Sequence, residues 1–469
     1  MRKQTDKAEL FERTPVAKAL MTMAVPTVIS QIINLIYNMV DAFFIGRTGN
    51  SYMAAATTLT LTLVMMNTAL SNLFGIGGGS LVARLMGAKK PEEARRVSAF
   101  GFYGAVCIAL LYSLLTGIFL RPVLMFLGGS EATLGYASQY TLLVIVLGAL
   151  PSILSMTLAH MLRNAGYAGK AGIGLSGGGI LNMILDPLFM FVLLPKGQEV
   201  TGAALATLLS NTASCAYLLY SFRKASGTAP LSMRLRDALS IGRENAKSLF
   251  SVGVPSALLT GLFDLANVCV NMIAAAHSDL VLAGMGIVMK VERIPTAISL
   301  GICQGMLPIV AYNYSAGNHA RMKKTVNLAR AWGLAVSAAG ILLFQLFTEP
   351  VTHLFMSTSG AGAEAALQTL GYAALFLRIR SLASPLQLTN YHSSYCMQAM
   401  GNGKRTMLHA FVRELVFYIP LMFLMDHLFG EKGLAFALIA GEGCGAVFAL
   451  ILLNRTIRGN RKEEEKNRS

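Results

Sequence analysis

Residues 19–45 read ALMTMAVPTVISQIINLIYNMVDAFFI, an apolar stretch whose sole charged residue is Asp41. Such a stretch is long enough to cross a membrane as a helix. It contains Val25-Pro26, and the same pair recurs 229 residues later as Val254-Pro255. Similar shifts pair Ala54 with Ala283, Pro122-Val123 with Pro350-Val351, Pro151 with Pro385 and Pro187 with Pro420. We therefore predict a duplicated bundle, an arrangement typical of transporters in which two halves face a central path.

Composition places the whole chain in a membrane. Hydrophobic residues make up 54% of the 469 residues and charged residues 13%, and the mean hydropathy is +0.56, whereas soluble domains carry about a quarter charged residues. Twelve candidate spans follow, at 19–45, 53–82, 97–120, 140–162, 173–194 and 203–222, and at 249–276, 280–312, 326–347, 363–400, 407–429 and 434–453. We predict an all-α integral membrane protein with twelve transmembrane helices in two six-helix, pseudo-symmetric lobes. The eighth and tenth spans are too long for one crossing, so we expect them to bend or protrude.

Basic residues predict the orientation. Thirty of the 39 Lys and Arg residues fall on one side, including Arg2, Lys3 and Lys7, while the other side has Arg47, Arg121, Lys196 and Lys432. Positive loops mark the cytoplasm, so both termini are expected there, with the protein in the plasma (inner) membrane. The predicted domains are a first lobe at 1–225, a cytoplasmic amphipathic connector at 226–248, a second lobe at 249–455 and a charged cytoplasmic tail at 456–469.

The net charge of +16 needs no nucleic-acid partner, because basic loops beside helices bind anionic lipid headgroups. In the connector, Leu231, Leu235 and Leu239 recur at four-residue spacing beside arginines, which predicts a short helix lying on the inner leaflet or a plain linker. The first 18 residues are too polar for a secretory signal, so the first helix is expected to stay.

Several motifs are missing from the sequence. The six cysteines are scattered singly, without metal or disulfide spacing, and no GxxxxGK[ST] motif occurs. Gly77-Gly78-Gly79 and Gly177-Gly178-Gly179 lie inside spans, where close helix packing or bending explains them better than a phosphate site. No cofactor is expected, and an ion gradient is the remaining energy source.

Acidic residues inside the spans are the candidates for an ion site, because a buried carboxylate is costly unless it is paired or protonated. Six lie well inside: Asp41, Asp186, Asp264, Glu292, Glu414 and Glu442. Glu292 is flanked by Lys290 and Arg293, and Glu414 follows Arg413, so structural ion pairing or a place near the cytoplasmic mouth is the favoured reading for both. Glu442 has no local partner, and its role stays open.

Asp41 and Asp186 are the strongest candidates. Both fall in the outer half of the first lobe. Asn182 precedes Asp186 by four residues and so shares its helix face. Pro187 frees the carbonyl near Met183 from its helical bond. Carboxylate, amide and carbonyl oxygens suit a sodium ion or a shared proton.

These residues resemble those of the multidrug and toxic compound extrusion (MATE) family, prokaryotic branch, from about Val25 to Leu453. The resemblance rests on the order and spacing of several short motifs. They are Val25-Pro26 with DAFFIG at 41–46, LVARLMGA at 81–88, NMILDP at 182–187, GAALAT at 202–207 and QGMLPIV at 304–310.

The resemblance implies two six-helix lobes and a cation site of Asp41, Asn182, Asp186 and Thr207, with protons or sodium undecided and no other metal. It implies efflux of amphiphilic organic cations by a secondary antiporter, here expected to be a monomer. Asp264, Glu292 and Glu442 are carried as second-lobe candidates for coupling or substrate binding.

Other readings stay in view. A lipid-linked saccharide flippase would need basic residues for pyrophosphate, and Lys290, Arg293, Arg378 and Arg380 keep it open. A membrane enzyme would need a clustered His, Ser or Cys site, and His160, His353, His392 and His409 form no spaced motif. A receptor or passive channel would not need the paired aspartates.

Overall fold

The computed structural model describes residues 9–354 and 363–468, and long helices make up nearly all of them. Residues Arg2, Lys3 and Lys7 of the first basic group lie outside the described residues. The first half contains α2 (Val16–Arg47), α3 (Ser51–Gly87), α4 (Pro91–Ile118), α5 (Leu120–Phe126), α6 (Glu131–Thr141), η1 (Leu142–Leu147), α7 (Ala149–Asn164), α8 (Ala168–Pro187), η2 (Leu188–Leu193) and α9 (Glu199–Ser226).

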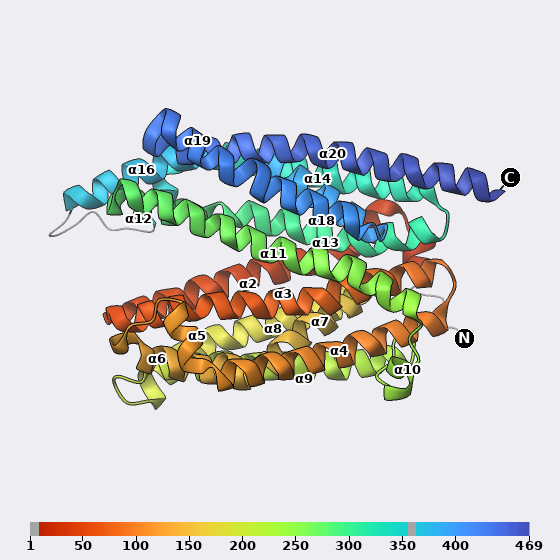
Figure 1. Ribbon diagram of the computed structural model, residues 1–469, viewed down its shortest axis with the longest axis horizontal. Coiled ribbons are helices and arrows are strands. Elements are labelled where there is room, and N and C mark those ends of the chain that lie inside the picture. The colour runs from red at the N-terminus through yellow and green to blue at the C-terminus, as the bar shows by residue number, and fades with distance from the viewer. Residues whose placement is uncertain (1–8, 355–362, 469) are drawn as a thin grey trace.

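The second half repeats this order after a short helix, α10 (Leu235–Leu239). It contains α11 (Arg243–His277), α12 (Asp279–Val291), α13 (Arg293–Ser315), α14 (His319–Leu346), α15 (Thr348–His353), α16 (Ala363–Ser381), α17 (Ser384–Ala399), α18 (Gly403–Phe411), η3 (Val412–Tyr418), α19 (Ile419–Phe429), η4 (Gly430–Lys432) and α20 (Gly433–Arg468). Figure 1 shows α2–α9 and α11–α20 as two separate groups of helices.

The twelve predicted spans correspond to helical units of the described chain. Within residues 9–354 and 363–468, nine helices are long and apolar enough to cross a membrane, and the bent pair Glu131–Leu147 and Ala149–Asn164 makes a tenth. One of the nine, Gly403–Arg458, turns back at η4 and therefore supplies two passes. The remaining pass, α16 with α17, is less apolar because α17 buries polar residues such as Asn390 and Gln398. The predicted twelve-helix, two-lobe fold is confirmed.

The two spans that were predicted to bend are both interrupted. The eighth breaks at Glu292, between α12 and α13, and the tenth breaks at Leu382–Ala383, between α16 and α17. The described part of the chain contains three wide π-helical turns, each with a proline within four residues: Pro151 after η1, Pro187 before η2 and Pro420 after η3. Because proline has no N–H, the helix near it loses a backbone bond, and wide turns of this kind are frequent at functional sites.

Both termini and α10 lie at one end of the bundle, here called the terminus end; α12, α16 and α19 extend to the other, the far end (Figure 1). The lobes meet where α3 packs on α11 and α2 packs on α13. This inter-lobe seam lies at the terminus end, because it uses the last part of α3, the first part of α2 and the matching parts of α11 and α13. Toward the far end, Phe43, Leu61, Leu265 and Met272 are exposed.

Two glycines show how close the seam is. A Cβ atom at Gly77 would lie 2.6 Å from the carbonyl oxygen of Leu249, and one at Gly253 would lie 2.0 Å from that of Leu73. Helix backbones therefore touch across the seam, which small residues allow. Close packing, predicted for the Gly77 triplet, is what the structure shows.

The connector and tail differ in detail from the prediction. Leu235 and Leu239 are exposed on the five-residue α10, but Leu231 is buried before it, so the three leucines do not form one face. The second lobe begins earlier than predicted, since α11 starts at Arg243. The predicted tail is not separate, because α20 continues as a helix to Arg468.

Candidate functional site

The first lobe brings four predicted residues together. Asp41 lies on α2, Asn182 and Asp186 on α8, and Thr207 on α9; α8 packs against both other helices. The amide of Asn182 donates through Nδ2 to Asp186 Oδ1 and to Thr207 Oγ1, both at 3.3 Å. These contacts turn the Asn182 carbonyl oxygen away from Asp186 Oδ1 and Thr207.

Three oxygens of this group have no hydrogen-bond donor among the described residues. They are Asp41 Oδ1, Asn182 Oδ1 and Asp186 Oδ2, and all three atoms are buried. Asp186 itself is 0% exposed, and the two carboxylates interact electrostatically. Buried anionic oxygens without donors are costly unless a cation or a proton binds them.

The chain changes its helical geometry directly beside Asp186. Pro187 ends α8 directly after Asp186, and the next six residues form the π-helical turn η2. The missing N–H of Pro187 leaves the helix without one of its bonds at this point. The acidic side chain therefore sits where α8 changes geometry.

Two tyrosines complete the surroundings of the aspartates. Tyr37 on α2 and Tyr140 on α6 interact electrostatically with both Asp41 and Asp186. The sequence prediction missed them. Tyr37 precedes Asp41 by four residues and shares its face of α2, a signal that was available; Tyr140 comes from a different helix.

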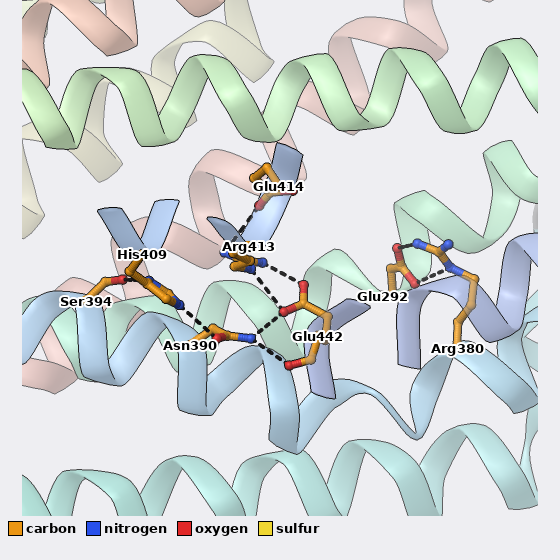
Figure 2. A network of polar contacts seen from close by, with 8 residues as sticks. All are labelled: Glu292, Arg380, Asn390, Ser394, His409, Arg413, Glu414 and Glu442. Carbon is orange, nitrogen blue, oxygen red and sulfur yellow. Dashed lines mark hydrogen bonds and ion pairs between the residues drawn. The ribbon is translucent and has the colours of Figure 1, made fainter. Parts of the chain in front are cut away.

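Two of the second-lobe candidates, Glu292 and Glu442, lie in the polar network drawn in Figure 2. Glu292, at the break between α12 and α13, accepts two bonds from Arg380, at 3.0 Å from Nε and 2.5 Å from Nη2. The expected ion pairing of Glu292 is present, although its partner is Arg380 of α16 and not a neighbour in sequence.

Glu442 of α20 is also paired. Its carboxylate accepts from Arg413 at 2.6 Å and 3.1 Å, and from Asn390 Nδ2 at 2.6 Å. The amide oxygen of Asn390 lies 3.0 Å from His409 Nε2, whose other ring nitrogen lies 2.9 Å from Ser394 Oγ. Figure 2 shows this chain running from α18 to α20.

Glu414 and Asp264 stand apart from these pairs. Glu414 is buried beside Arg413, at 3.5 Å from Nη1. Asp264 on α11 is half-buried and interacts electrostatically with Arg293. The structure does not connect Asp264 to Glu292 or Glu442 by any contact among the described residues.

A further polar bridge crosses the seam. Arg163 of α7 donates from Nη1 to Gln304 Oε1 at 3.0 Å, and Gln304 Nε2 donates to the hydroxyl of Tyr395 at 3.3 Å. His160 lies 3.3 Å from the same guanidinium nitrogen. Sequence reasoning did not single out this bridge, because its members come from three different helices.

The family model MatE matches the chain twice, at residues 26–188 and 255–424. The chain belongs to the MatE family. The two matches also cover the two halves that were predicted from the sequence.

Among curated proteins, the multidrug export protein MepA of Staphylococcus aureus is 29% identical over 448 residues, covering 94% of each chain. The sequence from another S. aureus strain is 30% identical over 444 residues with the same coverage. MepA of Staphylococcus saprophyticus is 29% identical over 443 residues.

Two solved structures share the fold. A MATE protein in complex with MaL6 superimposes with a TM-score of 0.90, at 22% identity over 97% of this chain and 99% of that one. An outward-facing MATE-family multidrug resistance transporter gives 0.89, at 22% identity over 97% and 98%. The chain is thus a multi-pass membrane transporter of the MATE multidrug efflux type.

Proposed function

We propose that this protein exports amphiphilic organic cations in exchange for protons or sodium ions that bind at Asp41, Asn182, Asp186 and Thr207. The three buried oxygens without donors carry this proposal, because no described side chain bonds to them, a sodium ion takes carboxylate and amide oxygens as ligands, and a proton neutralises a carboxylate. The names of the curated relatives support a drug-like substrate.

The lobes supply the second part of the mechanism. They are joined at the terminus end, which basic loops assign to the cytoplasm, so the far end is the outward side. An ion that binds the outward state more tightly shifts the protein toward that state and favours release of the drug. The first helix contains Pro26, whose carbonyl lies against Gly172 of α8, so α2 can transmit the change.

The plasma (inner) membrane, a cytoplasmic position for both termini and a monomeric state belong to the same proposal. Basic loops at the terminus end favour contact with anionic lipids.

The lipid-linked saccharide alternative has weaker support. It would use Lys290, Arg293, Arg378 and Arg380 for a pyrophosphate, but Arg380 is bonded twice to Glu292, and Arg378 lies near Glu349 at 3.9 Å. We expect Lys290→Ala and Arg293→Ala to leave the preference for organic cations unchanged. Flipping of a labelled lipid-linked sugar by the parent, without cation efflux, would reverse this choice.

The deciding experiment measures efflux of a fluorescent cation from proteoliposomes under an imposed proton or sodium gradient. Asp41→Asn and Asp186→Asn should insert normally and lose efflux against the substrate gradient, because an amide neither exchanges a proton nor balances a cation. Glu131→Gln, which changes an exposed carboxylate outside the site, is the control. Full gradient-driven efflux by either site variant contradicts the proposal.

A further inference from the structure

The buried network of the second lobe contains one carboxylate too many. Two guanidinium groups, Arg380 and Arg413, face three carboxylates, Glu292, Glu414 and Glu442. The side chains of Arg380, Arg413, Glu414 and Glu442 are at most 4% exposed. Arginine stays protonated in proteins, so the group carries one uncompensated negative charge when all three acids are ionised.

Hydrogen bonding identifies the surplus acid. Glu292 accepts two bonds from Arg380, and Glu442 accepts two from Arg413 and one from Asn390. Such charge-assisted, forked bonds hold a carboxylate in its ionised form. Within residues 9–354 and 363–468, the structure gives Glu414 a 3.5 Å contact with Arg413 and no hydrogen bond.

We propose that Glu414 is a second proton-binding site of the transporter, and that one proton on its carboxyl group neutralises the network. This inference rests on the proposed ion-driven exchange. The proton adds to a carboxylate oxygen of Glu414, and Arg413 stays bonded to Glu442.

The groups around Glu414 are less able to accept that proton than Glu414 itself. The groups that face it are Arg413 and Tyr418 on the same π-helical turn, Glu442 on α20 and Tyr391 on α17. Arg413 lies over the ring of Tyr391, 4.9 Å from its centre. On α18, His409 is held between Ser394 and Asn390, so its ring is already engaged.

The position of Glu414 also connects this residue to the movement of the lobes. The turn η3 packs against α11, and α11 is the helix that meets α3 across the inter-lobe seam. A change at the seam therefore moves the helix that borders Glu414, and the proton affinity of this site changes with the state of the transporter.

This proton changes the number of charges that cross the membrane in each transport cycle. One ion at the first-lobe site and one proton at Glu414 enter for each monovalent organic cation that leaves, so each cycle moves one net positive charge inward. A potential of 100 mV, negative inside, should then change the steady-state substrate gradient about 50-fold at fixed ion gradients. Without the Glu414 proton, the exchange becomes one for one and ignores the potential.

The test uses the full chain in proteoliposomes, with ethidium as the monovalent cation and the potential clamped at 0 or 100 mV by potassium and valinomycin. The parent and the exposed-carboxylate control Glu131→Gln should show the shift of the substrate gradient with potential. Glu414→Gln and Glu414→Met should lose this shift and retain only the weaker efflux that the first-lobe ion drives. A parent that ignores the potential, or a Glu414 variant that keeps the full shift, overturns the inference.

Folding of the variants is itself informative. Removing the Glu414 carboxylate, which accepts no hydrogen bond from Arg413, should leave the thermal unfolding temperature unchanged or higher, because Arg413 keeps its bonds to Glu442. If both Glu414→Gln and Glu414→Met failed to fold, Glu414 would be a structural partner of Arg413, and the inference would be wrong. Asp41→Asn distinguishes a failure of this inference from a failure of the proposed function, because it abolishes ion-driven efflux whether or not Glu414 binds a proton.

Discussion

The bridge across the seam predicts the effect of replacing Gln304 by leucine, a residue of similar volume. Arg163 is 3% exposed, and its Nη1 donates to Gln304 Oε1 at 3.0 Å. A hydrogen bond to a charged group contributes about 1.5–3 kcal/mol. Since this bond exists when the seam is closed, Gln304→Leu should raise the population with an open seam about 10- to 150-fold.

A cysteine placed in the seam reports that population. Ser80 of α3 is 0% exposed and donates to the backbone oxygen of Gln398 on α17, so a thiol reagent reaches a Ser80→Cys thiol when the seam opens. The alkylation rate of this thiol, read by mass spectrometry, should rise by the same factor when Gln304→Leu is added. Gln139→Leu, which removes a contact to Thr201 within the first lobe, should leave the rates unchanged. Unchanged rates in a folded Gln304→Leu protein would refute the assignment of the bridge to the closed seam.

Two further variants test the packing and the second lobe. Gly253→Val should prevent closure of the seam, because a Cβ there would lie 2.0 Å from Leu73 O. Fast alkylation of the Ser80→Cys thiol without added substrate is the expected result, and slow alkylation contradicts it. Glu442→Gln should cost about 3–5 kcal/mol of stability, because it leaves Arg413 buried without its main partner. The double variant Arg413→Met with Glu442→Leu should cost less, because it removes both charges. Equal thermal unfolding temperatures for the two proteins would disprove this.

The two lobes and the twelve spans were predictable from the sequence for physical reasons, and so was the shared helix face of Asn182 and Asp186. Apolar length and the placement of basic residues depend on the membrane alone, and Asn182 and Asp186 share one helix face at a spacing of four. Thr207 came from the family resemblance, and the structure places it within 3.3 Å of Asn182.

The second lobe was harder to read because its partners are distant in sequence. Glu442 has no local partner, yet Arg413 and Asn390 reach it from other helices. Glu292 is flanked by Lys290 and Arg293 but bonds to Arg380. No periodicity encodes contacts of this kind, since they depend on how α16, α17 and η3 pack against α20. For the same reason, neither the position of Tyr140 nor the bridge from Arg163 to Gln304 could be predicted from the sequence.

The glycine contacts of the seam also bear on how this protein can evolve. At Gly77 and Gly253, nearly every substitution adds atoms where a neighbouring backbone already lies. New side chains are tolerated far more easily toward the far end, where Phe43, Leu265 and Met272 are exposed. Heritable changes that broaden or narrow the range of transported compounds should therefore accumulate toward the far end of the helices, while the terminus end drifts slowly.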